Sequence, residues 1–269
     1  MRTLANFGFA ALLVAATPVA AAEVDWSKVD DAFGKKGAMQ AGDVYRATFP
    51  RTDLQVKLDG VSLKPGFASG THIEMKATGD RAMMMGDLVL TEAEINPVMK
   101  RLLDGGIQVT AVHNHLLRTS PALYYMHVGG DADPVAMAKT LHAALQLSKT
   151  PLIAAAASPP PQLDLDTAAI ESTLGTKGNN NGGVLQFSIP RGDAITENGM
   201  TVPPAMGVAN GINFQPTGGG KAAITGDFVL AASEVQPVLK ALRDGGIDVT
   251  ALHSHMIDDQ PHLFFMHFW

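Results

Sequence analysis

An internal repeat is the feature that most constrains this chain. Residues 86–127 align without a gap with residues 226–267, and 22 of the 42 aligned positions are identical. The same offset of 140 residues carries Pro50-Arg51 onto Pro190-Arg191. Self-similarity at a fixed spacing indicates that one structural unit occurs twice. The chain must therefore fold as two related units rather than as one large irregular domain.

The expected boundaries follow from the repeat and from composition. We predict one copy over residues 24–149 and the other over residues 163–269. The residues between them, 150–162, are rich in alanine and proline, as linkers often are. With two copies of one design, packing of the copies on each other is a reasonable expectation.

Each copy has the pattern of an α+β domain. In the first copy we expect helices over residues 26–33, 91–104 and 133–147, and strands over residues 44–49, 70–76, 82–90, 107–115 and 123–128. The second copy repeats this order but stops before a counterpart of the helix at 133–147. Pro97 leaves two alternatives for the middle helix, a kinked helix or a start at Asn96. We predict a mainly antiparallel sheet with helices packed on one side.

The first 22 residues predict a signal peptide. Arg2 precedes an apolar run from Phe7 to Ala16, and small residues end at Ala22, where cleavage is expected. The run is shorter than the ~20 residues that span a bilayer. We therefore expect a periplasmic or secreted protein that is soluble after cleavage, without a stable membrane anchor.

Composition excludes several functional classes. The formal net charge is −6 and no run of Lys or Arg occurs, which argues against a nucleic-acid partner. The chain has no cysteine, so disulfides, thiolate metal ligands and a cysteine nucleophile are excluded. A hydrophobic content of 46% is enough to form sizeable cores.

Histidines are the strongest candidates for chemistry. Six of the nine occupy three repeated positions: His113, His115 and His127, and their counterparts His253, His255 and His267. Residues two apart in a strand share a face, so His113 and His115 could converge on one ion. His127 lies on the returning strand. It joins them if it pairs with Ala111 or His113.

The first copy has two further candidates. His72 and Glu74 alternate along the strand predicted over residues 70–76, whereas the aligned positions of the second copy carry Ile212 and Phe214. We therefore predict the metal site in the first copy, with His72 or Glu74 completing the shell, and a structural remnant in the second. Nitrogen and carboxylate ligands favour zinc among divalent transition metals, with copper as an alternative because methionines 83–85 lie nearby. Asp87 and Asp227 are interpreted as structural residues at strand turns.

One stretch resembles a known family. Gly106 to His115, followed by Pro121 and Met126-His127, is similar to the LppY/LpqO family of exported bacterial proteins. That resemblance covers both copies and implies an exported protein with a tandem domain of uncharacterised function. The named members are lipoproteins, whereas this chain has no cysteine to carry a lipid.

Three functional hypotheses remain, and whether the protein is an enzyme is left open. The first is a metal-binding module for metal handling or sensing. The second is a metal-dependent hydrolase in which Glu74 acts as the base on a metal-bound water and an unknown small molecule is the substrate. The third is a metal-free envelope protein, ligand-binding or structural, in which the histidines only pack.

Overall fold

The computed structural model describes residues 23–153, called repeat 1 below, and residues 159–269, called repeat 2. The predicted signal peptide lies outside the described residues, as do residues 154–158 of the predicted linker. Among the helices described, none is long and apolar enough to cross a membrane.

Repeat 1 is built on a six-stranded antiparallel sheet with the strand order β1-β2-β5-β6-β8-β7. Its strands are β1 (Ala38–Gln40), β2 (Val44–Pro50), β5 (Gly70–Ala77), β6 (Ala82–Leu90), β7 (Gln108–His113) and β8 (Tyr124–Ala132), with a small hairpin of β3 (Lys57–Leu58) and β4 (Val61–Ser62). Its helices are α1 (Trp26–Phe33), α2 (Pro65–Ala68), α3 (Glu92–Asp104) and α4 (Pro134–Leu145).

Repeat 2 has the corresponding sheet in the order β15-β17-β14-β13-β10-β9. The elements of this repeat are α5 (Thr167–Leu174), β9 (Asn179–Asn181), β10 (Val184–Pro190), β11 (Thr196–Glu197), β12 (Met200–Thr201), the 3-10 turn η1 (Pro204–Met206), β13 (Ala209–Gly218), β14 (Lys221–Ala231), α6 (Ala232–Asp244), β15 (Val249–His253), β16 (Asp259–Gln260) and β17 (Leu263–Phe268). Antiparallel sheets with their long helices on one side confirm the predicted α+β class of both copies.

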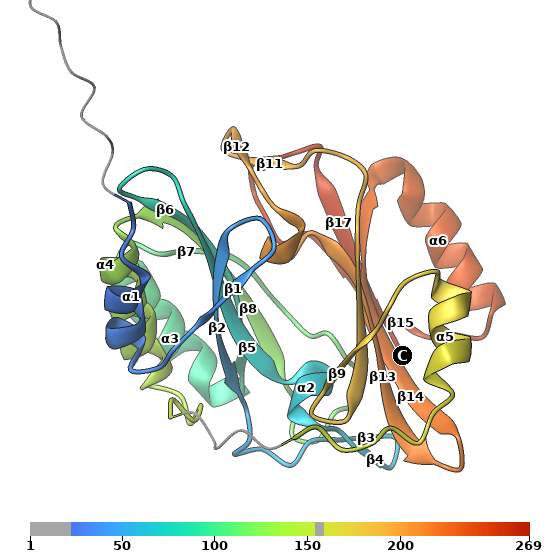
Figure 1. Ribbon diagram of the computed structural model, residues 1–269. Helices are drawn as coiled ribbons and strands as arrows, with labels where there is room; N and C mark the ends of the chain where they lie inside the picture. Colours follow the sequence, from blue (N-terminus) through green and yellow to red (C-terminus); the bar gives the residue numbers. More distant parts are fainter. Residues whose placement is uncertain (1–22, 154–158) are drawn as a thin grey trace, which may run out of the picture.

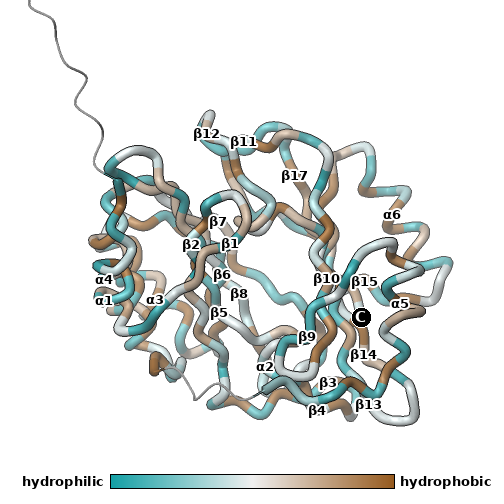
Figure 2. The backbone as a smooth tube through the Cα atoms, in the orientation of Figure 1, coloured by the Kyte–Doolittle hydropathy of each residue, from teal (hydrophilic) through white to brown (hydrophobic). Residues whose placement is uncertain are grey.

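The two sheets face each other, and the long helices cover their outer faces (Figure 1). The outer core of repeat 1 joins α1, α3 and α4 to the sheet, and that of repeat 2 joins α5 and α6 to the other sheet. Further hydrophobic clusters lie between the sheets and contain residues of both repeats, such as Met83 with Val229 and Phe265. Hydrophobic residues are accordingly spread along the strands of both sheets (Figure 2). Each sheet therefore has a covered outer face and a covered inner face.

Polar contacts also join the repeats. Gln215 donates to the Ser62 carbonyl and accepts from the Lys64 amide, both at 2.8 Å. The Thr250 hydroxyl donates to the His115 carbonyl at 2.5 Å. The last contact joins β15 of repeat 2 to the loop after β7 of repeat 1, beside the repeated histidines.

The start of α3 decides between the two alternatives for Pro97. Thr91 caps the helix, and the Glu94 carboxylate accepts from the Thr91 amide at 2.8 Å, which completes a capping box. The helix begins at Glu92 and contains Pro97, so the alternative start at Asn96 is wrong. The predicted strand over residues 107–115 is also shorter than expected, because β7 ends at His113.

Candidate metal centre

Matching hairpins carry the repeated histidines. In repeat 1, His113 is the last residue of β7, His115 lies in the loop that follows, and His127 lies in β8. Ala111 pairs directly with His127, which is one of the two registers that bring the third imidazole to the face of the others. Repeat 2 has the same arrangement, with Ala251 opposite His267.

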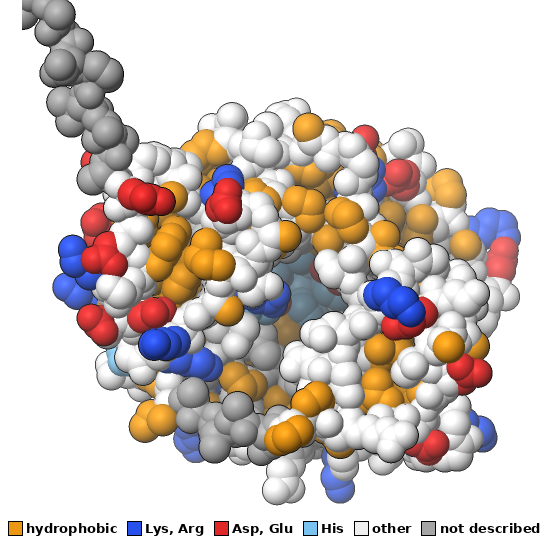
Figure 3. Space-filling model, in the orientation of Figure 1, with side chains coloured by type: hydrophobic (Ala, Val, Ile, Leu, Met, Phe, Trp, Pro, Cys, Tyr) orange, Lys and Arg blue, Asp and Glu red, His pale blue; other side chains and the backbone are white. Residues whose placement is uncertain are grey.

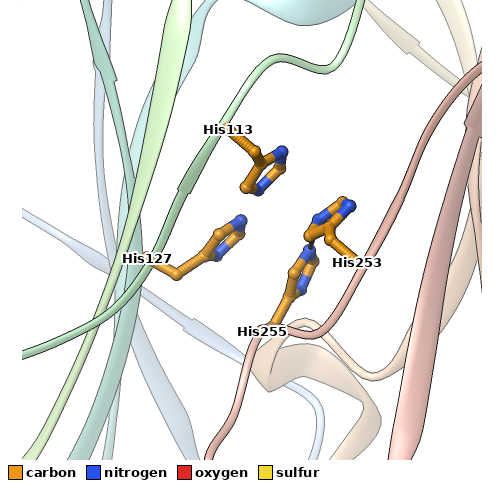
Figure 4. Close-up of side chains that lie close together, drawn as sticks. All are labelled: His113, His127, His253 and His255. Carbon is orange, nitrogen blue, oxygen red and sulfur yellow. Dashed lines mark hydrogen bonds between the residues drawn. The ribbon is translucent and has the colours of Figure 1, made fainter.

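The two hairpins face each other across the space between the sheets, so the six imidazoles lie close together. Figure 4 shows four of them, His113, His127, His253 and His255. We call these six side chains the histidine cluster. Ring centroids lie 3.5 Å apart for His113 and His253, 3.8 Å for His115 and His267, and 3.7 Å for His127 and His255. His113 contacts its own counterpart, while His115 and His127 each contact the counterpart of the other. A two-fold axis between the repeats generates this reciprocal pattern.

Within the cluster, four sets of side chains bring their ligand atoms within 4.8 Å of one another. These sets are His113, His127, His253 and His255; His113, His115 and His267; Asp87, His115 and His127; and Asp227, His255 and His267. Both of the sets made of histidine alone draw on the two repeats. The three predicted histidines of repeat 1 do come close together, but the imidazole nearest to each of them belongs to repeat 2.

Two carboxylates approach the cluster at distances that suit shared ligation better than hydrogen bonding. Asp87 lies 3.7 Å from His115 Nε2 and 3.9 Å from His127 Nε2, and Asp227 lies 3.8 Å from His267 Nε2. Two ligand atoms of a tetrahedral ion with bonds of about 2.0–2.1 Å lie about 3.3 Å apart. Small side-chain adjustments would therefore place both kinds of ligand on one ion.

Buried polar atoms without hydrogen-bond partners concentrate at this cluster. They include His113 Nε2, His115 Nε2, His127 Nε2, His253 Nδ1, His267 Nε2, Asp87 Oδ1 and Asp227 Oδ1. An unsatisfied buried polar atom costs about 1–3 kcal/mol. A cation coordinated by these atoms would remove that cost, so the donor set fits a metal ion.

Burial also holds the imidazoles in the form that binds metals. It lowers the pKa of all six, to about 4 for His113 and to about 3 for His253. The rings are therefore neutral near neutral pH and keep a free lone pair. Burial raises the pKa of Asp87 to about 7, with His72 opposing and Glu74 adding to the shift. Burial and the charge of Asp87 likewise raise the pKa of Asp227.

Asp87 and Asp227 are the site residues that the sequence interpretation missed. Neither lies at a turn. Asp87 is in the middle of β6 opposite His127, and Asp227 is in β14 opposite His267. The available signal was the Gly-Asp pair that repeats at the same offset as the histidines. The role of an aspartate at this position depends on the residue that it faces on the neighbouring strand. The sequence of one strand does not show which residue that is.

His72 and Glu74 lie on β5 beside the cluster but are in none of the four sets. Glu74 is 2% exposed and is held by Arg46 Nε at 2.9 Å and by His72 Nδ1 at 3.0 Å. His72 is the cross-strand partner of Asp87. These two residues therefore form, with Arg46, a polar wall next to the candidate ligands.

The predicted counterparts of this wall in repeat 2 were wrong. Asp227 pairs with Gly211, and Gln186 pairs with Asn213. By register, Gly211 therefore corresponds to His72 and Asn213 to Glu74, rather than Ile212 and Phe214. The offset here is one residue shorter than in the hairpins, and a one-residue shift in a strand exchanges its two faces. Repeat 1 still carries charged groups where repeat 2 carries neutral ones.

The cluster lies at the bottom of a hollow. Pale blue histidine side chains are visible at its floor, deep between the two halves of the molecule (Figure 3). The candidate ligands are thus largely covered by protein but are reached from one side of the molecule.

Comparison with known proteins identifies the family. The model of a Domain of Unknown Function (DUF1259) matches residues 27–147 and again residues 168–269. The chain belongs to the DUF1259 family. No curated protein matches this DUF1259 chain. A trimeric bacterial microcompartment shell protein, PduB, aligns over 86% of this chain and 82% of its own, with 14% identity and a TM-score of 0.20, which carries no argument about fold or function.

Proposed function

We propose that this protein is an exported metal-binding protein whose two repeats jointly hold divalent transition metal ions at the histidine cluster, for metal handling or sensing. The observation that carries the proposal is the set of buried nitrogen and carboxylate atoms that converge between the repeats without hydrogen-bond partners. Natural proteins seldom leave such atoms unsatisfied, and metal coordination accounts for all of them together. Export and the LppY/LpqO relationship are parts of the proposal that rest on the sequence.

The symmetry of the candidate ligands leads us to expect two ions per chain. The two-fold relation carries the set of His113, His127, His253 and His255 onto His113, His115, His253 and His267, which contains every member of the set of His113, His115 and His267. An arrangement that favours one ion therefore favours a second at the equivalent position. Nitrogen ligands with carboxylates suit zinc first, and also copper, iron or nickel.

A metal-dependent hydrolase is the second candidate. The hollow above the cluster favours it, because a catalytic metal needs an open position for water and substrate. The hypothesis that Glu74 acts as the base fits less well, since its carboxylate already pairs with Arg46 and His72. A metal-free structural role fits least, because it leaves the buried ligand atoms without partners.

Elemental analysis of the protein without a polyhistidine tag tests the proposal. We expect about two metal ions per chain after loading with zinc and dialysis. The double variant His113→Ala/His253→Ala should lose most of this metal. His142→Ala is the matched control, because His142 contacts the Phe33 carbonyl far from the cluster. A wild-type protein that retains no metal under any loading condition would refute the proposal.

A further inference from the structure

A second feature between the repeats is a cavity of 390 Å³ that adjoins the histidine cluster. Its wall combines the first half of β6 and parts of β7 and β8 in repeat 1 with the β11–β12 turn and the loop after β15 in repeat 2. The side chains used below are Met83, Met85, Met200, Met256, His255 and Glu197. The cavity is a composite of both repeats, as the histidine cluster is.

Methionine is strongly enriched in this wall. Five of the 14 lining residues are methionines, compared with 13 of the 269 residues of the chain. Strand alternation directs Met83 and Met85 toward the space between the sheets, while Met84 packs in the outer core of repeat 1. Met200 and Met256 come from repeat 2 and pack in the same inner cluster as Met83. Four methionines from three segments of the two repeats therefore line one cavity.

Two donors of other kinds lie in the same wall. His255 lines the cavity and also belongs to two of the ligand sets of the histidine cluster. Glu197 has a buried carboxylate oxygen without a hydrogen-bond partner. The cavity is thus continuous with the proposed metal centre, and its four inner methionines add uncharged sulfur donors to the oxygen and nitrogen donors of the same wall.

Ligand chemistry decides which metal such a wall would take. Soft thioether sulfur selects Cu(I), whereas imidazole and carboxylate ligands accept zinc and other divalent ions. Uncharged sulfur ligands also suit a monovalent ion better than a divalent one, because they neutralise none of the charge of the ion. We propose that the methionine-lined cavity is a Cu(I) site, separate from the histidine cluster and joined to it through His255.

The site deepens the proposed function by adding Cu(I) to the metals handled, but its test does not require a working histidine cluster. Full-length protein without a polyhistidine tag is titrated with Cu(I) under anaerobic conditions against a chromophoric Cu(I) chelator. Zinc binding is measured in parallel on the same preparation. The wild type should bind Cu(I), and its X-ray absorption spectrum should show sulfur ligands to copper.

The informative variant replaces Met83, Met85, Met200 and Met256 with leucine. Met-to-Leu replacement conserves apolar volume at modest cost. We expect Cu(I) affinity to fall by at least about tenfold, with zinc affinity unchanged. Loss of a residue that only supports a metal ligand already lowers metal affinity by about that factor, so loss of the ligands themselves should cost at least as much. The control Met75→Leu/Met126→Leu alters two methionines of the outer core of repeat 1 that do not line the cavity, and it should bind Cu(I) like the wild type.

Two results would overturn the site. One is equal Cu(I) affinity of the wild type and the four-leucine variant, which would make the methionines ordinary packing residues. The other is a copper spectrum of the wild type with nitrogen ligands alone, which needs no variant to fold. Loss of zinc binding in His113→Ala/His253→Ala with Cu(I) binding retained would support the two sites as separate. A wild type that binds Cu(I) through sulfur but never zinc would refute the proposed function and keep the cavity site.

Discussion

The two repeats carry the same arginine–glutamate pair in different surroundings. Arg51 in repeat 1 and Arg191 in repeat 2 each donate to a glutamate in the first turn of the following helix, Glu94 and Glu234. The side chains of Arg51 and Glu94 are 0% and 9% exposed, whereas those of Arg191 and Glu234 are 11% and 42% exposed. Both repeats therefore have the same ion-pair contacts, but only in repeat 1 is the pair buried from solvent.

The difference comes from what lies outside each sheet. In repeat 1, α4 packs against α1 and α3, and the Lys149 amide after α4 donates to Glu94. Repeat 2 as described has no counterpart of α4, and α5 has no fully buried residue. Repeat 1 therefore has the more completely buried core. The histidine cluster, in contrast, takes equal numbers of imidazoles from both repeats, so its geometry is symmetric although the burial of the two cores is not.

The largest expected effect tests the unequal scaffolds. Arg51→Ala would leave Glu94 buried without its partner, which costs about 3–5 kcal/mol of unfolding free energy. Arg191→Ala removes a pair that water reaches, which costs about 1 kcal/mol or less. Urea unfolding of the two variants measures the difference. Equal losses would show that the burial of the two pairs does not differ in solution.

A second prediction tests the equality of the metal ligands. His127→Ala and His267→Ala remove equivalent ligands, so we expect both to lower zinc affinity by about 100-fold or more. Competition with a zinc-binding dye provides the affinities. If His127→Ala abolishes binding while His267→Ala leaves it intact, the metal belongs to repeat 1 alone, as the sequence pattern suggested.

The pH dependence of stability sharpens the comparison of the scaffolds. Burial opposes ionisation of Glu94, but hydrogen bonds from Arg51 and from the Thr91 and Lys149 amides outweigh it and hold the pKa below its usual value of 4.5. A depressed folded-state pKa stabilises the fold above the unfolded value and loses that contribution as pH falls through the folded value. We expect the free energy of unfolding to decrease as the pH is lowered from about 4.5, and we expect this decrease to be smaller in Glu94→Gln. Urea unfolding across acidic pH checks it; an unchanged slope in Glu94→Gln would contradict the assignment.

The smallest expected effect concerns the polar wall that only repeat 1 has. His72→Ala should leave zinc affinity within about twofold of the wild type, because His72 is outside every candidate ligand set and its hydrogen bond goes to Glu74, which is not a candidate ligand either. The same dye competition measures it. A loss as large as that of His127→Ala would make His72 a ligand and restore the asymmetric site.

Much of the fold was predictable because local signals agreed with the tertiary structure. The internal repeat indicated two copies, and strand alternation and the Thr91 capping box located several elements. The sequence left the register of His127 conditional, and the structure has one of the two registers that bring it to His113 and His115, opposite Ala111. The position of the cluster was not predictable, because it depends on how the inner faces of the sheets meet. Nothing within one repeat indicates that His113 would contact His253 rather than complete a shell with His72.

The most direct test of the central claim is an anomalous difference map from crystals of the zinc-loaded protein. We expect peaks between the two sheets, each within about 2.0–2.1 Å of histidine nitrogens that belong to both repeats. A peak whose protein ligands all come from repeat 1, or an empty histidine cluster in crystals grown with zinc, would contradict the account.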